Sequence, residues 1–206
     1  MKKLIVLFWL FYFLINLSVS ASATLIEIDF NDLSEGEVLT DQYLASGVTV
    51  SLLDTPPGYV EGPVATTFDS SKYPQASPPI ALNPGDDVID PFYDIIFSFE
   101  QTIDYFSFWS FNSDEIVTVK GYRNGTLLQS KSYGPGRDYQ AYELVLGAIG
   151  GHLFFDTVII DVVAGPGGTE EEPGTEGGPE WFDNLSFNTA SAPVPVAPFM
   201  LLLGLN

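Results

Sequence analysis

The chain has 206 residues and carries 27 acidic against seven basic side chains, a formal net charge of −20. So acidic a surface repels phosphate backbones and anionic lipid headgroups, which argues against a nucleic-acid partner. The sequence contains no cysteine, which excludes disulfides, thiol nucleophiles and thiolate metal sites.

The N-terminus has the features of a secretory signal peptide. Lys2 and Lys3 precede an uncharged apolar run, Leu4–Ile15, and Ala21-Ser22-Ala23 fits the small-x-small pattern of a signal-peptidase site. We therefore predict a signal peptide over residues 1–23 and an exported chain that begins at Thr24; an uncleaved N-terminal anchor is the alternative. Five basic residues then face 27 acidic ones, a net charge of −22.

From Thr24 onward the sequence reads as strands and turns. Ile26 and Ile28 alternate with acidic residues, the period of a half-buried strand, and Asn124-Gly125 between two such runs predicts a hairpin. About nine strands in one domain, 24–188, predict an all-β fold, a single antiparallel β-sandwich. The predicted strands are 26–30, 47–53, 93–99, 103–111, 115–122, 127–133, 139–146, 153–163 and 181–187, with one or two short edge strands between 54 and 90.

Two segments fall outside this pattern. Residues 165–180 are rich in glycine, proline and glutamate and predict a disordered acidic loop, with a weak calcium or partner contact as the alternative. Residues 189–206 form a Pro-rich linker and the apolar run Phe199–Leu205, which is too short to span a bilayer. We interpret this run as the first part of a C-terminal sorting helix; a hydrophobic tail with a minor packing role is the alternative.

The predicted strand 103–111 carries aromatic side chains on both faces. Phe106 and Phe108 share one face, whereas Tyr105 and Trp109 share the other, which is more than one buried face requires. The second face is either an exposed platform that stacks sugar rings or a face covered by the segment 54–90. The candidate carbohydrate-binding residues are Trp109 and Trp181.

The sequence contains few candidate catalytic residues. His152 is the only histidine, it follows two glycines as a turn or edge residue would, and no Gly-x-Ser-x-Gly motif presents a serine. A pair of carboxylates for glycoside hydrolysis is available among 27 acids, but that abundance singles out no pair. We predict no catalytic residues and no enzyme, with a glycoside hydrolase as a lesser alternative.

The opening Ile28-Asp-Phe-Asn-Asp-Leu33, the closing strand Trp181–Phe187 and the tail Val194-Pro195-Val196-Ala197-Pro198 resemble exported proteins of the PEP-CTERM class. The Pro-Glu-Pro triplet and the terminal arginine cluster of that class are absent, and the apolar helix is short. The resemblance implies a jelly-roll type of sandwich, a Gram-negative producer of exopolysaccharide, general secretory export and recognition of the tail by an exosortase-like enzyme.

The resemblance also implies a structural Ca²⁺ between the first and last strands. The matching residues are Asn31 and Asp32 after the first strand and Asp183 in the last, and oxygen ligands of this kind suit calcium. The alternative is that Asp183 only bonds backbone.

These observations together predict a non-enzymatic protein of the cell surface or extracellular matrix, associated with exopolysaccharide or biofilm. The alternative is a calcium-dependent carbohydrate-binding module. A polysaccharide and the sorting enzyme are the expected partners.

Overall fold

The computed structural model describes residues 23–53, 60–67, 71, 73, 75–77, 79–83, 94–111, 116–134, 141–163 and 181–190. One compact unit spans Thr24–Ala190. The predicted signal peptide up to residue 22, the acidic loop and the C-terminal tail lie outside the described residues. Among the described residues, no helix is long and apolar enough to cross a bilayer.

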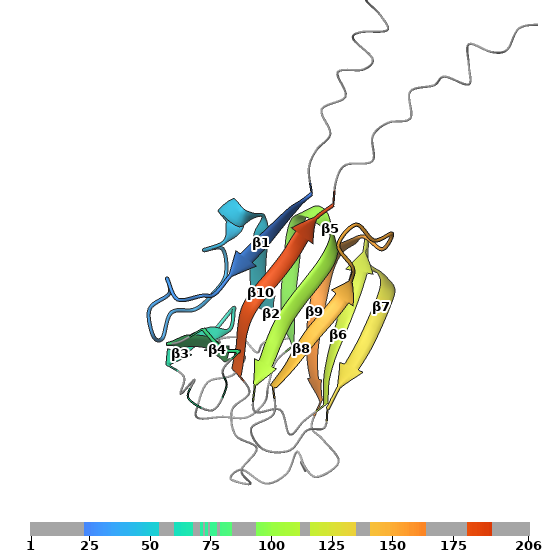
Figure 1. Cartoon of the computed structure of the whole chain (residues 1–206). Coiled ribbons are helices and arrows are strands. Elements are labelled where there is room, and N and C mark those ends of the chain that lie inside the picture. The colour runs from blue at the N-terminus through green and yellow to red at the C-terminus, as the bar shows by residue number, and fades with distance from the viewer. Residues whose placement is uncertain are drawn as a thin grey trace, which may run out of the picture. The chain divides into compact units, whose positions relative to one another are not determined.

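The fold is all-β and antiparallel, as predicted, with ten strands and one short 3₁₀ helix in the described part of the chain (Figure 1). The elements are β1 (Thr24–Ile28), η1 (Leu44–Ser46), β2 (Val48–Leu52), β3 (Val64–Thr67), β4 (Ile80–Asn83), β5 (Ile95–Phe111), β6 (Ile116–Arg123), β7 (Thr126–Tyr133), β8 (Ala141–Gly147), β9 (Phe155–Val163) and β10 (Trp181–Thr189).

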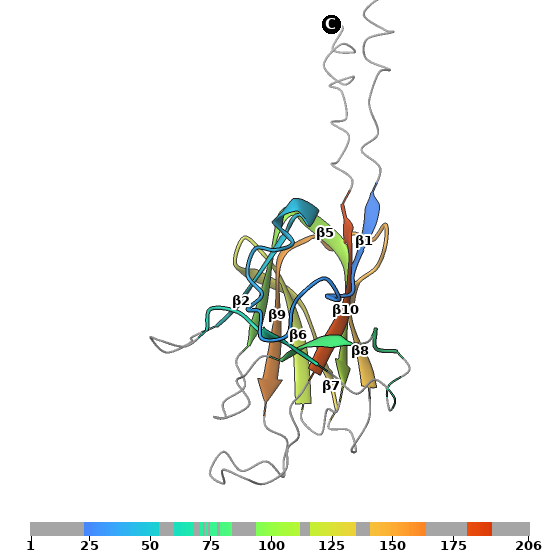
Figure 2. The ribbon, with the colours of Figure 1, turned by 90° about the vertical axis from the view of Figure 1, so that its left-hand side faces the viewer.

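The strands form two layers, which Figure 2 shows close to edge-on. The first layer, here called the front sheet, contains β1, β10, the second half of β5 and β8, with β4 beside the start of β10. The second layer, the back sheet, contains β2, the first half of β5, β9, β6 and β7. The predicted β-sandwich is therefore confirmed.

Two of the predicted strands form one continuous strand in the structure. The runs 93–99 and 103–111 were each predicted as a strand, but Ile95–Phe111 is continuous and passes from the back sheet to the front sheet. The pairing of β5 with β9 shifts register between Ser98 and Ile103, at the bend where the strand changes layers. The sequence suggests two strands because the neighbouring polar residues Glu100 and Gln101, both exposed, interrupt the alternation of side chains at the bend.

Phenylalanine side chains fill the space between the layers. Phe97 and Phe108 meet edge to face at 5.1 Å between ring centroids, and Phe108 stacks on Phe182 at 5.4 Å. All three are fully buried. The inward residues of β5 therefore join both sheets to one core, which stabilises a domain without disulfides.

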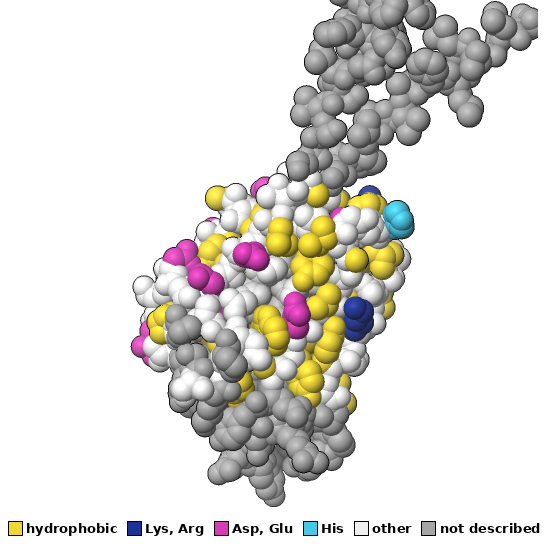
Figure 3. All heavy atoms as spheres, viewed as in Figure 1, with side chains coloured by type: hydrophobic (Ala, Val, Ile, Leu, Met, Phe, Trp, Pro, Cys, Tyr) yellow, Lys and Arg dark blue, Asp and Glu magenta, His cyan; other side chains and the backbone are white. Residues whose placement is uncertain are grey.

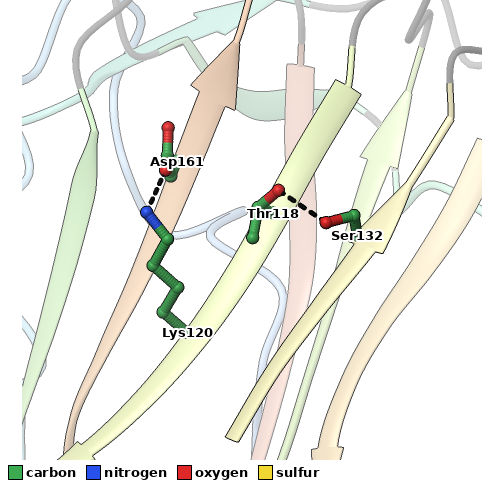
Figure 4. A network of polar contacts seen from close by, with 4 residues as sticks. All are labelled: Thr118, Lys120, Ser132 and Asp161. Atoms are coloured by element: carbon green, nitrogen blue, oxygen red, sulfur yellow. Dashed lines mark hydrogen bonds and ion pairs between the residues drawn. The ribbon is translucent and has the colours of Figure 1, made fainter. Parts of the chain in front are cut away.

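The predicted Asn124-Gly125 hairpin is present between β6 and β7, and both residues have positive φ. On the outer face of the back sheet, polar side chains cross between strands (Figure 4). Lys120 of β6 forms an ion pair with Asp161 of β9, and the hydroxyls of Thr118 and Ser132 lie 2.9 Å apart. This outer face is thus bound together by polar contacts.

Candidate functional site

The outer face of the front sheet carries the aromatic residues that the sequence singles out. Strand register places side chains in rows across β10, β5 and β8, because directly opposed residues point to the same face. One row is Asp183, Trp109 and Glu143, and the next toward the start of β10 is Trp181, Phe111 and Ala141. The two predicted sugar-binding tryptophans therefore lie on one face, in adjacent rows.

Trp109 is half-buried and supported by other rings. Its ring lies nearly parallel to that of Phe111, at 12° and 6.2 Å between centroids. Phe111 in turn contacts Tyr73 at 5.3 Å, and both of these are buried. Trp181 and Ala76 pack against the same small cluster. Because its neighbours are buried, Trp109 is held in place while part of its surface remains open to solvent.

The segment between Asp54 and Asp90 covers only part of this face. Tyr73 and Ala81 bury Phe111 completely, although Phe111 points outward from the sheet. Trp109 and Tyr105, further along β5, stay half-buried. The two alternatives for this face, an open platform or a covered one, thus each hold for a different part of it.

Polar groups border the open part. The Ser107 hydroxyl, two residues from Trp109 on the same face, donates a hydrogen bond of 2.6 Å to the exposed Glu143 carboxylate. Figure 3 shows hydrophobic side chains as a band over the face of β10, β5 and β8, with acidic side chains beside it. The face therefore combines flat apolar surface with hydrogen-bonding groups at its edge.

Asp183 lies on the same face, directly before the bulge of β10. The register of β10 shifts between Asp183 and Ser186, and Asn184 has a left-handed φ of 54°, a conformation that asparagine tolerates better than most residues. The Asp183 side chain is fully buried. Its Oδ2 accepts hydrogen bonds from the Ser77 N–H at 2.7 Å and the Ser77 hydroxyl at 2.9 Å, and its Oδ1 accepts the Asn184 N–H at 2.7 Å.

Burial raises the pKa of Asp183 to about 6, and the nearby charge of Asp29 adds to the effect, while the hydrogen bonds from Ser77 and Asn184 oppose it. The Ser77–Asp183 contact holds residues 75–77 over the front sheet, and the Asn184 side-chain amide donates to the Gln75 carbonyl at 2.6 Å. Sequence reasoning missed Ser77, because it lies in a proline-rich segment with no periodic pattern.

Two of the three predicted calcium ligands accept hydrogen bonds from the same segment, whereas the third accepts one from another part of the chain. Asn31 Oδ1 accepts the Ile80 N–H at 3.3 Å. Ile80 is three residues after Ser77, which donates to Asp183, so Asn31 and Asp183 bind the same segment. The exposed Asp32 instead accepts a hydrogen bond from the Tyr43 hydroxyl, and burial followed by this contact raises the pKa of Tyr43.

An oxygen of each predicted ligand thus already accepts a protein donor, and no cluster of three or more His, Cys, Asp or Glu side chains suited to a metal occurs among the described residues. Calcium binding here stays a prediction, and we give it no role in the proposed function.

The carboxylates beside Trp109 do not form a hydrolytic pair. Asp183 and Glu143 lie two strands apart, roughly 10 Å at the usual strand spacing. However, Asp183 is covered by Ser77 and has no exposed surface, so it cannot reach a glycosidic oxygen. His152 lies exposed in the loop before β9, away from this row.

No protein-family model and no curated protein matches the chain. Among solved structures, a tyrosine-to-alanine variant of the family 29 carbohydrate-binding module CBM29-2 is similar at 15% identity and a TM-score of 0.39, covering 82% of this chain and 95% of that one. Another variant of the module, complexed with cellulohexaose, is 13% identical with a TM-score of 0.34, covering 70% and 94%. The similarity is too low to transfer the function of those modules to this chain.

Proposed function

We propose that this chain is an exported, non-enzymatic polysaccharide-binding protein, and that it binds sugar on the open part of the front sheet around Trp109. The observation that carries the proposal is the support of Trp109. A half-buried ring stacked on a fully buried one offers a flat apolar surface that costs little conformational entropy to order.

A pyranose ring complements such a surface. Its C–H face is apolar and packs on an aromatic ring, whereas its hydroxyls point outward and need hydrogen-bonding groups at the side. The exposed Glu143 carboxylate stands beside Trp109 in this way on the adjacent strand, and the buried Ser107 hydroxyl holds it there by a hydrogen bond. Binding sites of small ligands commonly combine apolar walls with a few placed polar groups.

Charge restricts the class of polysaccharide. A protein with a net charge of −22 after removal of the signal peptide repels uronate- or sulfate-rich chains. The proposal is therefore for a neutral glycan. Location at the cell surface or in an exopolysaccharide matrix is part of the proposal and rests on the predicted signal peptide and tail, as does the exosortase-like partner.

Tryptophan fluorescence tests the proposal directly, because the chain from Thr24 contains only Trp109 and Trp181. Titration with neutral polysaccharides, such as hydroxyethylcellulose, xylan and mannan, is expected to change the emission with at least one of them. Trp109→Ala is expected to weaken that binding at least tenfold, which corresponds to about 1.4 kcal/mol. Alginate, an anionic chain, serves as the charge comparison and is expected to give no change.

The matched control is Tyr122→Ala, which removes a half-buried aromatic ring from the outer face of the back sheet. It should leave the affinity for the glycan unchanged. A flat titration against all three neutral polysaccharides would remove the proposal, and equal losses in both variants would show that Trp109 acts only through stability.

A further inference from the structure

The described part of the chain exposes six large hydrophobic side chains, and all of them lie toward one end of the sandwich. Their exposed fractions run from 39% for Leu128 and Leu153 to 60% for Ile149. We call this set the apolar rim: Leu25, Leu44, Leu127, Leu128, Ile149 and Leu153.

Backbone contacts show that the segments bearing these residues meet at this end. Leu25 of β1 is opposite Asn188 near the end of β10, and the Ala190 N–H donates to the Thr102 carbonyl at the bend of β5. The Glu100 N–H at the same bend donates to the Gly47 carbonyl, directly after η1, which contains Leu44.

The remaining rim residues are tied to the same place. The Gly150 N–H donates to Asp104 Oδ2 at 2.9 Å, which fixes the loop of Ile149 and Leu153 beside the start of the front half of β5. The Asn124 N–H donates to Asp156 at 2.7 Å, which places the turn before Leu127 next to β9. In Figure 1, η1, the start of β1, the end of β10 and the loop between β8 and β9 all lie at the top.

The chain leaves the domain at this end. Only residues 191–198 separate Ala190 from the apolar run Phe199–Leu205, and eight residues span at most about 29 Å when fully extended. Covalent connection thus limits the distance from Ala190 to the start of the apolar run. An apolar run of this kind can enter the membrane interface.

We infer that the apolar rim is a membrane-facing surface, which acts with the C-terminal apolar run to hold the domain on a bilayer of neutral headgroups. The rim side chains sit on four separate segments around one end, so a plane can contact them together, whereas a seven-residue peptide can cover only a few. Single apolar anchors bind membranes reversibly and weakly, and two are needed for stable attachment. The net negative charge selects a neutral rather than an anionic surface.

The test is flotation of the chain Thr24–Asn206 with phosphatidylcholine vesicles. The rim variant combines Leu25→Ser, Leu127→Ser, Ile149→Ser and Leu153→Ser. Its partition into vesicles is expected to fall at least tenfold, because each half-exposed apolar side chain contributes several-fold. Since these residues are exposed, the melting temperature should stay within a few degrees of the parent.

The control variant combines Thr118→Ala, Ser130→Ala and Ser132→Ala on the outer face of the back sheet and is expected to float like the parent. A chain ending at Ala190 should keep weak binding that the rim substitutions abolish. Equal flotation of the parent and the rim variant would overturn the inference and leave the tail as the sole anchor. Failure of the parent to float would also overturn the inference. If the parent were then a dimer and the rim variant a monomer, the rim would instead bind a second copy of the chain.

Discussion

The buried carboxylate of Asp183 makes a specific prediction about stability and pH. Its pKa is about 6 in the folded chain, raised mainly by burial from 3.8. At 1.36 kcal/mol per pKa unit, the difference corresponds to about 3 kcal/mol. The folded state holds this proton more tightly than the unfolded state. The contribution is therefore fully present below pH 3.8 and is lost as the pH rises through 6.

Other acids titrate over the same range, so the informative quantity is a difference between variants. Urea unfolding at pH 4 and pH 7.5 gives the change in the free energy of unfolding for the parent and for Asp183→Asn. We expect the parent to lose about 2.5 kcal/mol more than the variant over this interval, because the unfolded chain is already partly ionised at pH 4.

Asp183→Asn also leaves one of the Ser77 and Asn184 N–H groups facing an amide hydrogen, at a cost of about 1–3 kcal/mol that does not depend on pH. This cost is the same at both pH values, so it does not affect the change in the free energy of unfolding between them. Glu27→Gln, at an exposed carboxylate of β1, is the control and should follow the parent. An equal change in the free energy of unfolding between pH 4 and pH 7.5 for the parent and Asp183→Asn would refute the reasoning.

Two further outcomes follow from contacts described above or from the sequence. Tyr133→Phe removes a hydroxyl that donates to the Val145 carbonyl at 3.2 Å and accepts the Val145 N–H at 2.9 Å. Chemical unfolding should therefore show that the free energy of unfolding falls by about 1–3 kcal/mol. An unchanged midpoint would mean that water replaces both bonds. For calcium, the predicted site at Asn31, Asp32 and Asp183 implies a lower melting temperature with chelator than with Ca²⁺, because an ion that binds only the folded state stabilises it. An unchanged melting temperature would mean that these oxygens keep their protein donors and hold no cation.

The sequence predicts the strands and the sandwich because most of them alternate with a clear period. Ile116–Arg123 and Thr126–Tyr133, joined by Asn124-Gly125, are found almost as expected. The continuity of β5 was missed because the polar neighbours Glu100 and Gln101 interrupt the alternation at the bend. One or two short edge strands were expected between 54 and 90, and β3 and β4 lie there, but four-residue runs in a proline-rich segment give too little pattern to fix the bounds of β3.

The candidate site was only partly predictable. The alternation of β5 places Trp109 and Tyr105 on one face, and the register adds Trp181 beside them. The sequence does not show that Tyr73 and Ser77 cover one end of that face, because these contacts join separate segments and the Ser77–Asp183 contact spans 106 positions. The grouping of exposed leucines at one end is likewise a property of topology, since Leu25 and Leu153 are distant in the chain.

The pairing of β1 with β10 has a consequence for how the domain acquires its structure. Thr24 is opposite Thr189, so the first and last strands of the domain are neighbours. Contacts of such long sequence separation form slowly, because a long loop must close before they form. A chain that crosses a membrane from its N-terminus cannot complete the front sheet until β10 has emerged. The predicted export would then complete the aromatic face around Trp109 last, after β10 has crossed.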